Sequence, residues 1–438
     1  MKLLSILLIS TNVFAANYSN TNLIVKLKNS NSVKSLPSTN ILSSKKLFGT
    51  MYLFKTNNLE LLQKQLTNNP IIEYIQKDNI HEAQKEVKNN PPVSFNYKKL
   101  RSRPSDSPFH DPKSYKQWYL QNSKNHGIDL ETVYLKGLIS SKKEIIVAVV
   151  DSGVDYNHPD LKQKMWINGN EIPGDNIDND NNGYVDDIHG INTLLRDSKG
   201  NATSDPNPGK SGHGTHVAGI IAAEQNNDIG ITGISSNAKI MAIRTVPSSG
   251  DEKDSDVIEA FIYAAKNGAK IINCSFGKSI KDQAVSDAID YIGKKFDVLV
   301  IVSAGNNGKK LEKKPKYPAS FKNENKMTIG SSDLNGHRSS FSNYSQDKVD
   351  LFAPGGMVLS TFLNNKYKTL SGTSMASPVV SGVAAEIRSM YPNLTAKQVK
   401  TILNSSVVKN KRFRKKSISS GIINFYNALE AASKFTNN

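Results

Sequence analysis

Short apolar runs alternate with amphipathic segments from about Trp118 to the end of the chain. The runs are mostly apolar, as in strands buried on both faces; they are Ile145–Val150, Lys239–Arg244, Ile271–Ser275 and Val298–Val302. Between them, apolar residues recur at helical spacing in His213–Glu224, Asp256–Asn267 and Lys281–Lys294. The alternation predicts an α/β domain with a mostly parallel central sheet and helices on both faces.

The first part of the chain has a different pattern. Alternating or apolar runs at Asn22–Lys28, Lys46–Thr56 and Ile71–Lys77 predict three strands, and Leu59–Leu66 has the spacing of a helix. These elements suffice for a small α+β domain of the ferredoxin-like type. Residues 84–112 are polar, charged and proline-bearing, with little to bury, which predicts a linker exposed to proteolysis.

The N-terminus has the pattern of a secretory signal. Lys2 precedes an apolar run, and small side chains at Val13 and Ala15 end the segment at a position that a signal peptidase reads. Residues 1–15 are therefore expected to be removed, and the protein to be extracellular or periplasmic. Cys274 is the one cysteine, so no intrachain disulfide and no cysteine-based metal cluster is possible.

The chain is strongly basic, with 56 Lys and Arg against 39 Asp and Glu, a net charge of +17 in 438 residues. The densest basic run is Lys409–Lys416, but no nucleic-acid-binding signature surrounds it, so no nucleic acid is expected as a partner. Solvated loops are the favoured interpretation of these basic residues, and a general attraction to acidic substrates or anionic surfaces is the alternative. Past the N-terminus no apolar run approaches the roughly 20 residues of a membrane helix, so no transmembrane anchor is expected.

Three motifs together carry the residues of nucleophilic catalysis. Asp151 follows a buried strand in VVDSG, His213 opens an apolar helix in GHGTH, and Ser374 precedes the expected helix Val379–Tyr391 in GTSMASP. A serine hydroxyl needs an imidazole to accept its proton, and the imidazole needs a carboxylate to fix its tautomer. Ser374 also lies near a helix N-terminus, where backbone N–H groups stabilise negative charge.

The words VVDSGVD, GHGTHVAG and SGTSMASPVVSG resemble the three signatures of the subtilisin-like serine proteases, or subtilases, over about residues 112–435. The resemblance implies a three-layer subtilisin-like fold and a serine endopeptidase. It assigns Asp151 as the orienting acid, His213 as general base and acid, Ser374 as nucleophile and Asn306, in SAGNN, as the oxyanion donor. An α/β-hydrolase is disfavoured, because in that fold the serine precedes the acid and the histidine.

The same resemblance implies where a protein or peptide substrate binds. It places one backbone edge for an extended peptide at Ser275, Phe276 and Gly277 and a second edge around Ser249 and Gly250. Tyr317 and Pro318 resemble the wall of the first specificity pocket and are a candidate for a cis peptide bond, with ordinary turn chemistry as the alternative.

An oxygen-rich insert separates the acid from the histidine. Its spacing is similar to the first positions of an EF-hand loop, although His189 stands where that loop has a glutamate. A structural calcium ion is favoured over a solvated acidic loop, and the candidate ligands are Asp178, Asp180, Asn182, Asp186 and Asp187. Family resemblance alone suggests a second cation site with Gln117, Asp160 and Asn227.

The front domain resembles the propeptide that blocks the cleft of subtilases. This implies a zymogen with a signal peptide at 1–15, an inhibitor domain at 16–83, a linker with the processing site at 84–112 and a catalytic domain at 113–438. The protein is expected to act as a monomer, with its own propeptide as an intramolecular inhibitor. A permanent binding module at the front, a peptide ligase and an inactive binding protein on the same fold remain the alternatives.

Overall fold

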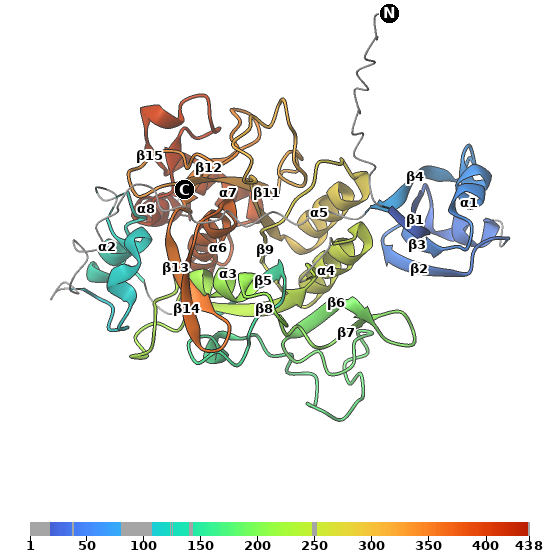
Figure 1. Cartoon of the computed structure of the whole chain (residues 1–438), viewed down its shortest axis with the longest axis horizontal. Helices are drawn as coiled ribbons and strands as arrows, with labels where there is room; N and C mark the ends of the chain where they lie inside the picture. The colour runs from blue at the N-terminus through green and yellow to red at the C-terminus, as the bar shows by residue number, and fades with distance from the viewer. Residues whose placement is uncertain are drawn as a thin grey trace, which may run out of the picture.

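The computed structural model describes residues 18–36, 39–79, 107–122, 124, 126–139, 143–247 and 252–436. The expected signal segment and most of the expected linker lie outside these residues. The described residues form two domains, a small N-terminal one, drawn in blue, and a larger one that follows it in the chain (Figure 1). No helix of the described residues is both long enough and apolar enough to cross a membrane.

The front domain is a four-stranded antiparallel sheet with one α-helix. Its order is β4-β1-β3-β2; the elements are β1 (Tyr18–Leu27), the 3-10 helix η1 (Ser30–Ser35), β2 (Ser43–Phe48), β3 (Met51–Lys55), α1 (Leu59–Leu66) and β4 (Ile72–Asn79). This is the ferredoxin-like strand order, with η1 in the place of the first helix. The expectation of one strand over Lys46–Thr56 is wrong, because Gly49, with a φ of +48°, turns the chain and divides it into β2 and β3.

The larger domain is built on a ten-stranded sheet of order β15-β16-β12-β11-β10-β9-β5-β8-β6-β7. Its strands are β5 (Ile145–Asp151), β6 (Gly190–Arg196), β7 (Ala202–Thr203), β8 (Ala238–Arg244), β9 (Ile271–Cys274), β10 (Leu299–Ser303), β11 (Lys326–Ser332), β12 (Leu351–Pro354), β15 (Val408–Lys409) and β16 (Gly421–Ile422). All pairs from β6 to β16 are parallel, and only the edge strands β7 and β15 run antiparallel. The hairpin of β13 (Val358–Phe362) and β14 (Lys366–Leu370) lies apart from this sheet.

Helices cover both faces of the sheet, as the sequence predicts. They are α2 (Leu130–Leu135), α3 (His213–Ala222), α4 (Asp254–Lys266), α5 (Gln283–Phe296), α6 (Thr373–Met390), α7 (Ala396–Ser405) and α8 (Phe425–Thr436), with 3-10 turns η3 (Ser114–Lys116), η4 (Trp118–Leu120), η6 (Lys162–Lys164) and η7 (Lys411–Phe413). One apolar core joins the sheet to α3 and α6, and a second joins its other face to α4 and α5. The front domain lies against the α4 and α5 side (Figure 1).

Helix α6 begins six residues earlier than the expected start at Val379, so Pro378 stands inside the helix. A proline has no N–H to donate to the carbonyl four residues earlier. Here that carbonyl belongs to Ser374, and it accepts instead from the Ser275 hydroxyl at 3.2 Å. A side chain from β9 thus replaces the missing helical hydrogen bond and fixes α6 to the end of that strand.

His216 on α3 ties the helix to the β13–β14 hairpin. Its Nε2 lies 2.8 Å from the carbonyl oxygen of Lys368, and its side chain is fully buried. Burial lowers the pKa of His216 to about 3, so the imidazole is neutral in the folded protein at ordinary pH.

We predict that acid destabilises the fold through His216. The unfolded chain binds a proton here below about pH 6.5 and the folded chain only near 3, so the free energy of unfolding falls across that window as the pH drops. In His216→Gln this slope should be shallower by up to about 1.4 kcal/mol per pH unit. Urea unfolding between pH 7 and pH 4 measures it, with His337→Gln on an exposed loop as control; equal slopes for wild type and His216→Gln would contradict the prediction.

Candidate active site

Three neighbouring parallel strands end together at one edge of the sheet. Asp151 is the last residue of β5, Ser275 follows β9, and Asn306 lies in the turn after β10. The carboxyl ends of parallel strands are where ligands bind in open α/β sheets. The strand order β10-β9-β5 therefore gathers candidate residues that are 31 to 155 positions apart in the sequence, by subtraction of their numbers.

Asp151 and His213 form a hydrogen-bonded pair. The His213 Nδ1 lies 2.8 Å and 3.0 Å from the two carboxylate oxygens of Asp151, which is buried, whereas the imidazole is 22% exposed. The Ser152 N–H donates to Asp151 Oδ1 at 2.7 Å and holds the carboxylate in place. A carboxylate on Nδ1 fixes the tautomer that leaves Nε2 to accept a proton.

Gly214 makes this approach of α3 to β5 possible. A Cβ at Gly214 would lie 2.2 Å from the carbonyl oxygen of Gly153, so any larger residue would push the start of α3 away from the strand. The glycine after His213 is thus a steric requirement of the Asp151–His213 contact.

Ser374 occupies the first turn of α6 and is 4% exposed. Its hydroxyl donates to the carbonyl oxygen of Ser275 at 3.2 Å, which places the oxygen at the end of β9, the neighbour of β5. The structure thus brings Ser374 to the same sheet edge as Asp151 and His213. The unpaired N–H groups of the helix N-terminus add a partial positive charge there.

Asn306 is oriented by Thr373. The Asn306 Oδ1 accepts from the Thr373 N–H at 2.9 Å and from its hydroxyl at 2.8 Å, so the amide nitrogen Nδ2 faces the opposite way. A Cβ on Gly372 would lie 3.4 Å from Asn306 Nδ2 and 3.6 Å from the Ser374 nitrogen. The missing side chain of Gly372 leaves a space between two N–H donors, which is the geometry that stabilises an oxyanion.

The expected substrate edge lies beside Ser374. Ser275 and Gly277 are buried, and Phe276, 2% exposed, belongs to the apolar core instead of facing solvent. The Tyr317–Pro318 peptide bond is cis. Tyr317 exchanges two backbone hydrogen bonds, of 2.9 and 2.8 Å, with Lys278. The other expected edge, Ser249 and Gly250, lies outside the described residues.

Cys274, one residue before this edge, is fully buried. Burial raises the pKa of its thiol well above the ordinary value, which suits an inert core residue.

The acidic insert folds into a loop in which three carboxylates converge. Ligand oxygens of Glu171, Asp178 and Asp180 lie within 4.8 Å of one another. The sequence prediction included both aspartates but missed Glu171, which precedes the EF-hand-like spacing and is buried. Carboxylates this close repel unless a cation joins them, and an all-oxygen set suits calcium.

The remaining predicted ligands of this loop have other partners. Asp186 accepts from the N–H groups of Gly174 and Asn176, at 2.7 and 3.2 Å, and so shapes a turn. Asp187 is buried against the Tyr263 hydroxyl, 2.5 Å away, and burial raises its pKa to about 6. Asn182 donates from its amide to Asp180 and Asp187, at 3.1 Å each.

The residues predicted for the second cation site contact one loop, residues 227–232. Asp160 accepts from the Asn227 amide at 3.0 Å and from the Ile231 N–H at 2.9 Å. The Gln117 amide oxygen accepts from the next N–H in the chain, that of Thr232, at 2.8 Å, and its amide nitrogen donates to the Thr232 carbonyl at 2.7 Å. Asp111, which sequence reasoning missed, contacts the same loop through the Asn227 N–H at 3.0 Å.

Comparison with known proteins adds an independent line of evidence. Residues 142–421 match the Subtilase family. A thermophilic serine proteinase of Bacillus sp. (strain AK1) is 36% identical over 341 residues, which are 78% of this chain and 69% of that protein. Thermitase of Thermoactinomyces vulgaris is 38% identical over 243 residues, 56% of this chain and 74% of thermitase.

A solved structure supports the same architecture. Fervidolysin from Fervidobacterium pennivorans, described as a keratinolytic enzyme related to subtilisin, superposes with a TM-score of 0.73 at 22% identity. The match covers 94% of this chain and 61% of fervidolysin, so it extends over the front domain as a likeness of fold. With the family match and the identities above, these findings show that the chain belongs to the subtilase family and is a serine endopeptidase that acts on proteins.

Proposed function

We propose that Asp151, His213 and Ser374 are the catalytic triad of this protease and that Asn306 completes its oxyanion site. The observation that carries the proposal is the 2.8 Å contact of His213 Nδ1 with a buried carboxylate, at the sheet edge that also holds Ser374. The paired donors around Gly372 supply the remaining requirement of acyl transfer.

The geometry gives each group one task. Ser374 Oγ attacks the peptide carbonyl carbon while His213 Nε2 accepts its proton, and Asp151 stabilises the imidazolium. The carbonyl electrons move to the oxygen, which Asn306 Nδ2 and the Ser374 N–H stabilise. The C–N bond then breaks as His213 returns the proton to the leaving amine. Water repeats the sequence on the acyl-enzyme and releases the acid.

The front domain is proposed to be an inhibitory propeptide that docks on α4 and α5. Asp78, fully buried, accepts from the Ser255 N–H at 2.9 Å and the Ser255 hydroxyl at 2.8 Å, in the first turn of α4. Gln76 accepts from the Ala284 N–H at 3.2 Å in the first turn of α5. One strand, β4, thus caps two helix N-termini of the larger domain.

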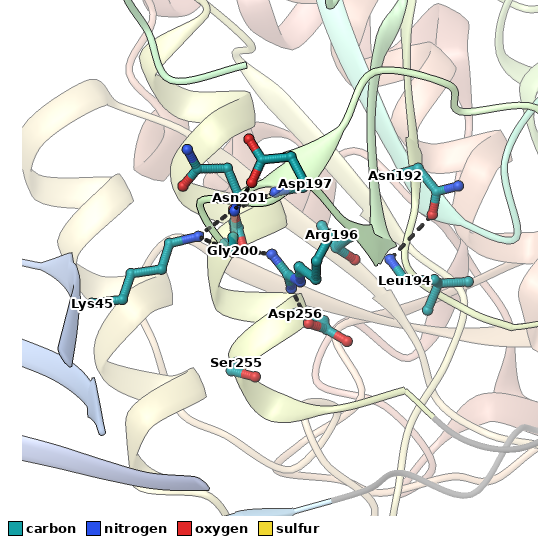
Figure 2. Close-up of polar contacts among 12 residues, drawn as sticks. Lys45, Asn192, Leu194, Arg196, Asp197, Gly200, Asn201, Ser255 and Asp256 are labelled. Carbon is teal, nitrogen blue, oxygen red and sulfur yellow. Dashed lines mark hydrogen bonds and ion pairs between the residues drawn. The ribbon is translucent and has the colours of Figure 1, made fainter. Parts of the chain in front are cut away.

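Ion pairs extend this interface along α4. Lys45 on β2 pairs with Glu259 at 2.9 Å and also reaches the carbonyl oxygen of Gly200. Figure 2 shows Lys45 extending from the front domain to Gly200, with Arg196 and Asp256 beside it. Arg196 forms ion pairs with Asp256 and Glu259 on α4. A cation from each domain therefore contacts the carboxylates of this helix.

The end of β4 lies next to the expected substrate edge. Asn79, its last residue, donates to Asp282, whose carboxylate pairs with Lys278 directly after Gly277. The chain that leaves the front domain therefore starts beside the site, as self-processing in the 84–112 linker requires.

Two further parts complete the proposal. Residues 1–15 direct secretion, and calcium binds at Glu171, Asp178 and Asp180.

The catalytic assignment is tested by two substitutions. Ser374→Ala should abolish both casein digestion and self-processing, leaving the full-length chain. Asn306→Ala removes one oxyanion donor and should lower kcat by about 10²–10³ with little change in KM, the range known for such a loss in subtilisin. Steady-state kinetics on a peptide substrate separates the two constants; casein digestion by Ser374→Ala at the wild-type rate would refute the assignment.

The inhibitory role of the front domain predicts a shorter latency in Asp78→Ala. The substitution removes charge-assisted hydrogen bonds of ~1.5–3 kcal/mol from the interface, so the lag before full activity of the freshly purified chain should shorten at least several-fold. Glu60→Ala, on the exposed side of α1, is the control and should keep the wild-type lag. A lag unchanged by Asp78→Ala would contradict inhibition through this contact.

Calcium at the acidic loop predicts a stability that depends on the ion. Calcium at 100 times its Kd should stabilise the protein by about 2.7 kcal/mol, and a chelator should remove this gain. Glu171→Gln and Asp178→Asn should each lower Tm in calcium more than in chelator, whereas Glu324→Gln on the surface should not. Tm is measured by calorimetry in the Ser374→Ala background, which avoids self-digestion. If the Tm of Ser374→Ala with an unaltered acidic loop does not depend on calcium, the site is excluded.

A further inference from the structure

Two chain segments leave adjacent strands on either side of Ser374. Strands β9 and β10 pair in parallel with Cys274 opposite Val302, so the segments that follow them begin side by side. Ser275 follows β9 and accepts from the Ser374 hydroxyl, whereas Asn306 follows β10 and accepts from Thr373. The reactive oxygen is thus bounded by the substrate edge and by the oxyanion turn.

Lys316 bridges these two segments from a third one. The backbone pairing of Tyr317 with Lys278 holds this third segment against the continuation of the substrate edge. The Lys316 Cγ lies 3.7 Å from the position of a Cβ on Gly305, directly before Asn306. At its other end the Lys316 ammonium donates to the Ser279 hydroxyl at 2.9 Å. The half-buried side chain therefore runs from the oxyanion turn to Ser279, two residues after the substrate edge.

A bound peptide would present one side chain to Lys316. A substrate strand alongside Ser275–Gly277, with its reactive carbonyl oxygen between Asn306 Nδ2 and the Ser374 N–H, is fixed in register by those two contacts. The residue that carries this carbonyl then projects its side chain away from the strand, between the two diverging segments that Lys316 spans. This step rests on the proposed roles of Ser374 and Asn306.

The segment that carries Lys316 is rich in basic residues. Residues 309–316 contain five lysines and a single acid, Glu312. The Glu312 carboxylate accepts from the Ser345 hydroxyl at 2.7 Å. Such a field attracts acidic peptides, and an ammonium at the subsite discriminates a carboxylate from a neutral side chain of the same shape. We propose that Lys316 makes this protease prefer glutamate or aspartate immediately before the bond that it cuts.

Matched peptides test the proposal on the self-processed enzyme. Three quenched fluorescent peptides should differ only in the residue before the cleaved bond, which is Glu, Gln or Leu. We expect kcat/KM for the Glu peptide to exceed that for the Gln peptide about tenfold at low salt, the scale of one charge-assisted hydrogen bond. Added NaCl should reduce this Glu/Gln ratio by screening.

Three variants locate the source of the ratio. Lys316→Met should bring the Glu/Gln ratio to about one, and Lys316→Arg should keep it well above one, because only the charge is shared with wild type. Lys313→Met, exposed on the same loop, is the control for the general field and should keep the wild-type ratio. The wild-type ratio and its salt dependence remain informative even if Lys316→Met fails to fold.

The outcomes separate this inference from the catalytic assignment. A wild-type enzyme that cuts the Gln or Leu peptide better than the Glu peptide overturns the role of Lys316, as does a Glu/Gln ratio that survives in Lys316→Met. Failure of wild type to cut any of the three peptides, together with casein, would instead refute the proposed catalytic site and the inference with it.

Discussion

The parallel register of β5, β9 and β10 is the constraint on which the site depends. Val150, Cys274 and Val302 lie opposite one another in one row across the three strands, and each is fully buried. The three strands therefore end within one residue of the same level, at Asp151, Cys274 and Ser303. A slip of one residue in β5 would move Asp151 by about 3.3 Å and turn its side chain to the other face of the sheet. This row lies in the core under α4 and α5, and its neighbours Val149 and Ile301 lie in the core on the other face. Burial of the strands on both faces makes such a slip costly, so the packing of the core sets the geometry of the Asp151–His213 pair.

The sequence allowed the central elements to be predicted because their signals are local. Apolar runs located β5, β8, β9 and β10 within one or two residues, and the three motifs identified the residues that the fold gathers. The start of α6 could not be predicted, because its first turn is polar and small, and because a hydrogen bond from Ser275 replaces the one that Pro378 lacks. Helical structure at Ser374 is therefore a tertiary effect that no propensity within Thr373–Ser377 reports.

The acidic loop shows the same limit. A spacing borrowed from the EF-hand included Asp178 and Asp180, two of the three carboxylates that converge, and also Asp186, whose carboxylate accepts from the Gly174 N–H in a turn. The spacing did not include Glu171, because the fold of the loop brings it to Asp178 across six intervening positions. Lys316 is a similar case, since only the pairing of Tyr317 with Lys278 reveals what its side chain spans. Residues that act through loop closure have no periodic signal in the sequence.

The charges on α4 are compatible with a front domain that binds firmly and can still separate, as the proposed inhibitory role requires. On α4, Asp254 pairs with Lys278 and Glu259 pairs with Arg196, and both cations belong to the larger domain itself. Buried ion pairs add little net stability, but a buried charge that loses its last partner costs several kcal/mol. If the front domain separates and takes Lys45 with it, Glu259 still has Arg196, so this helix face keeps no uncompensated charge. The cost of separation then lies in contacts made by front-domain groups, among them the hydrogen bonds of buried Asp78 to Ser255, which water replaces once the carboxylate is solvated.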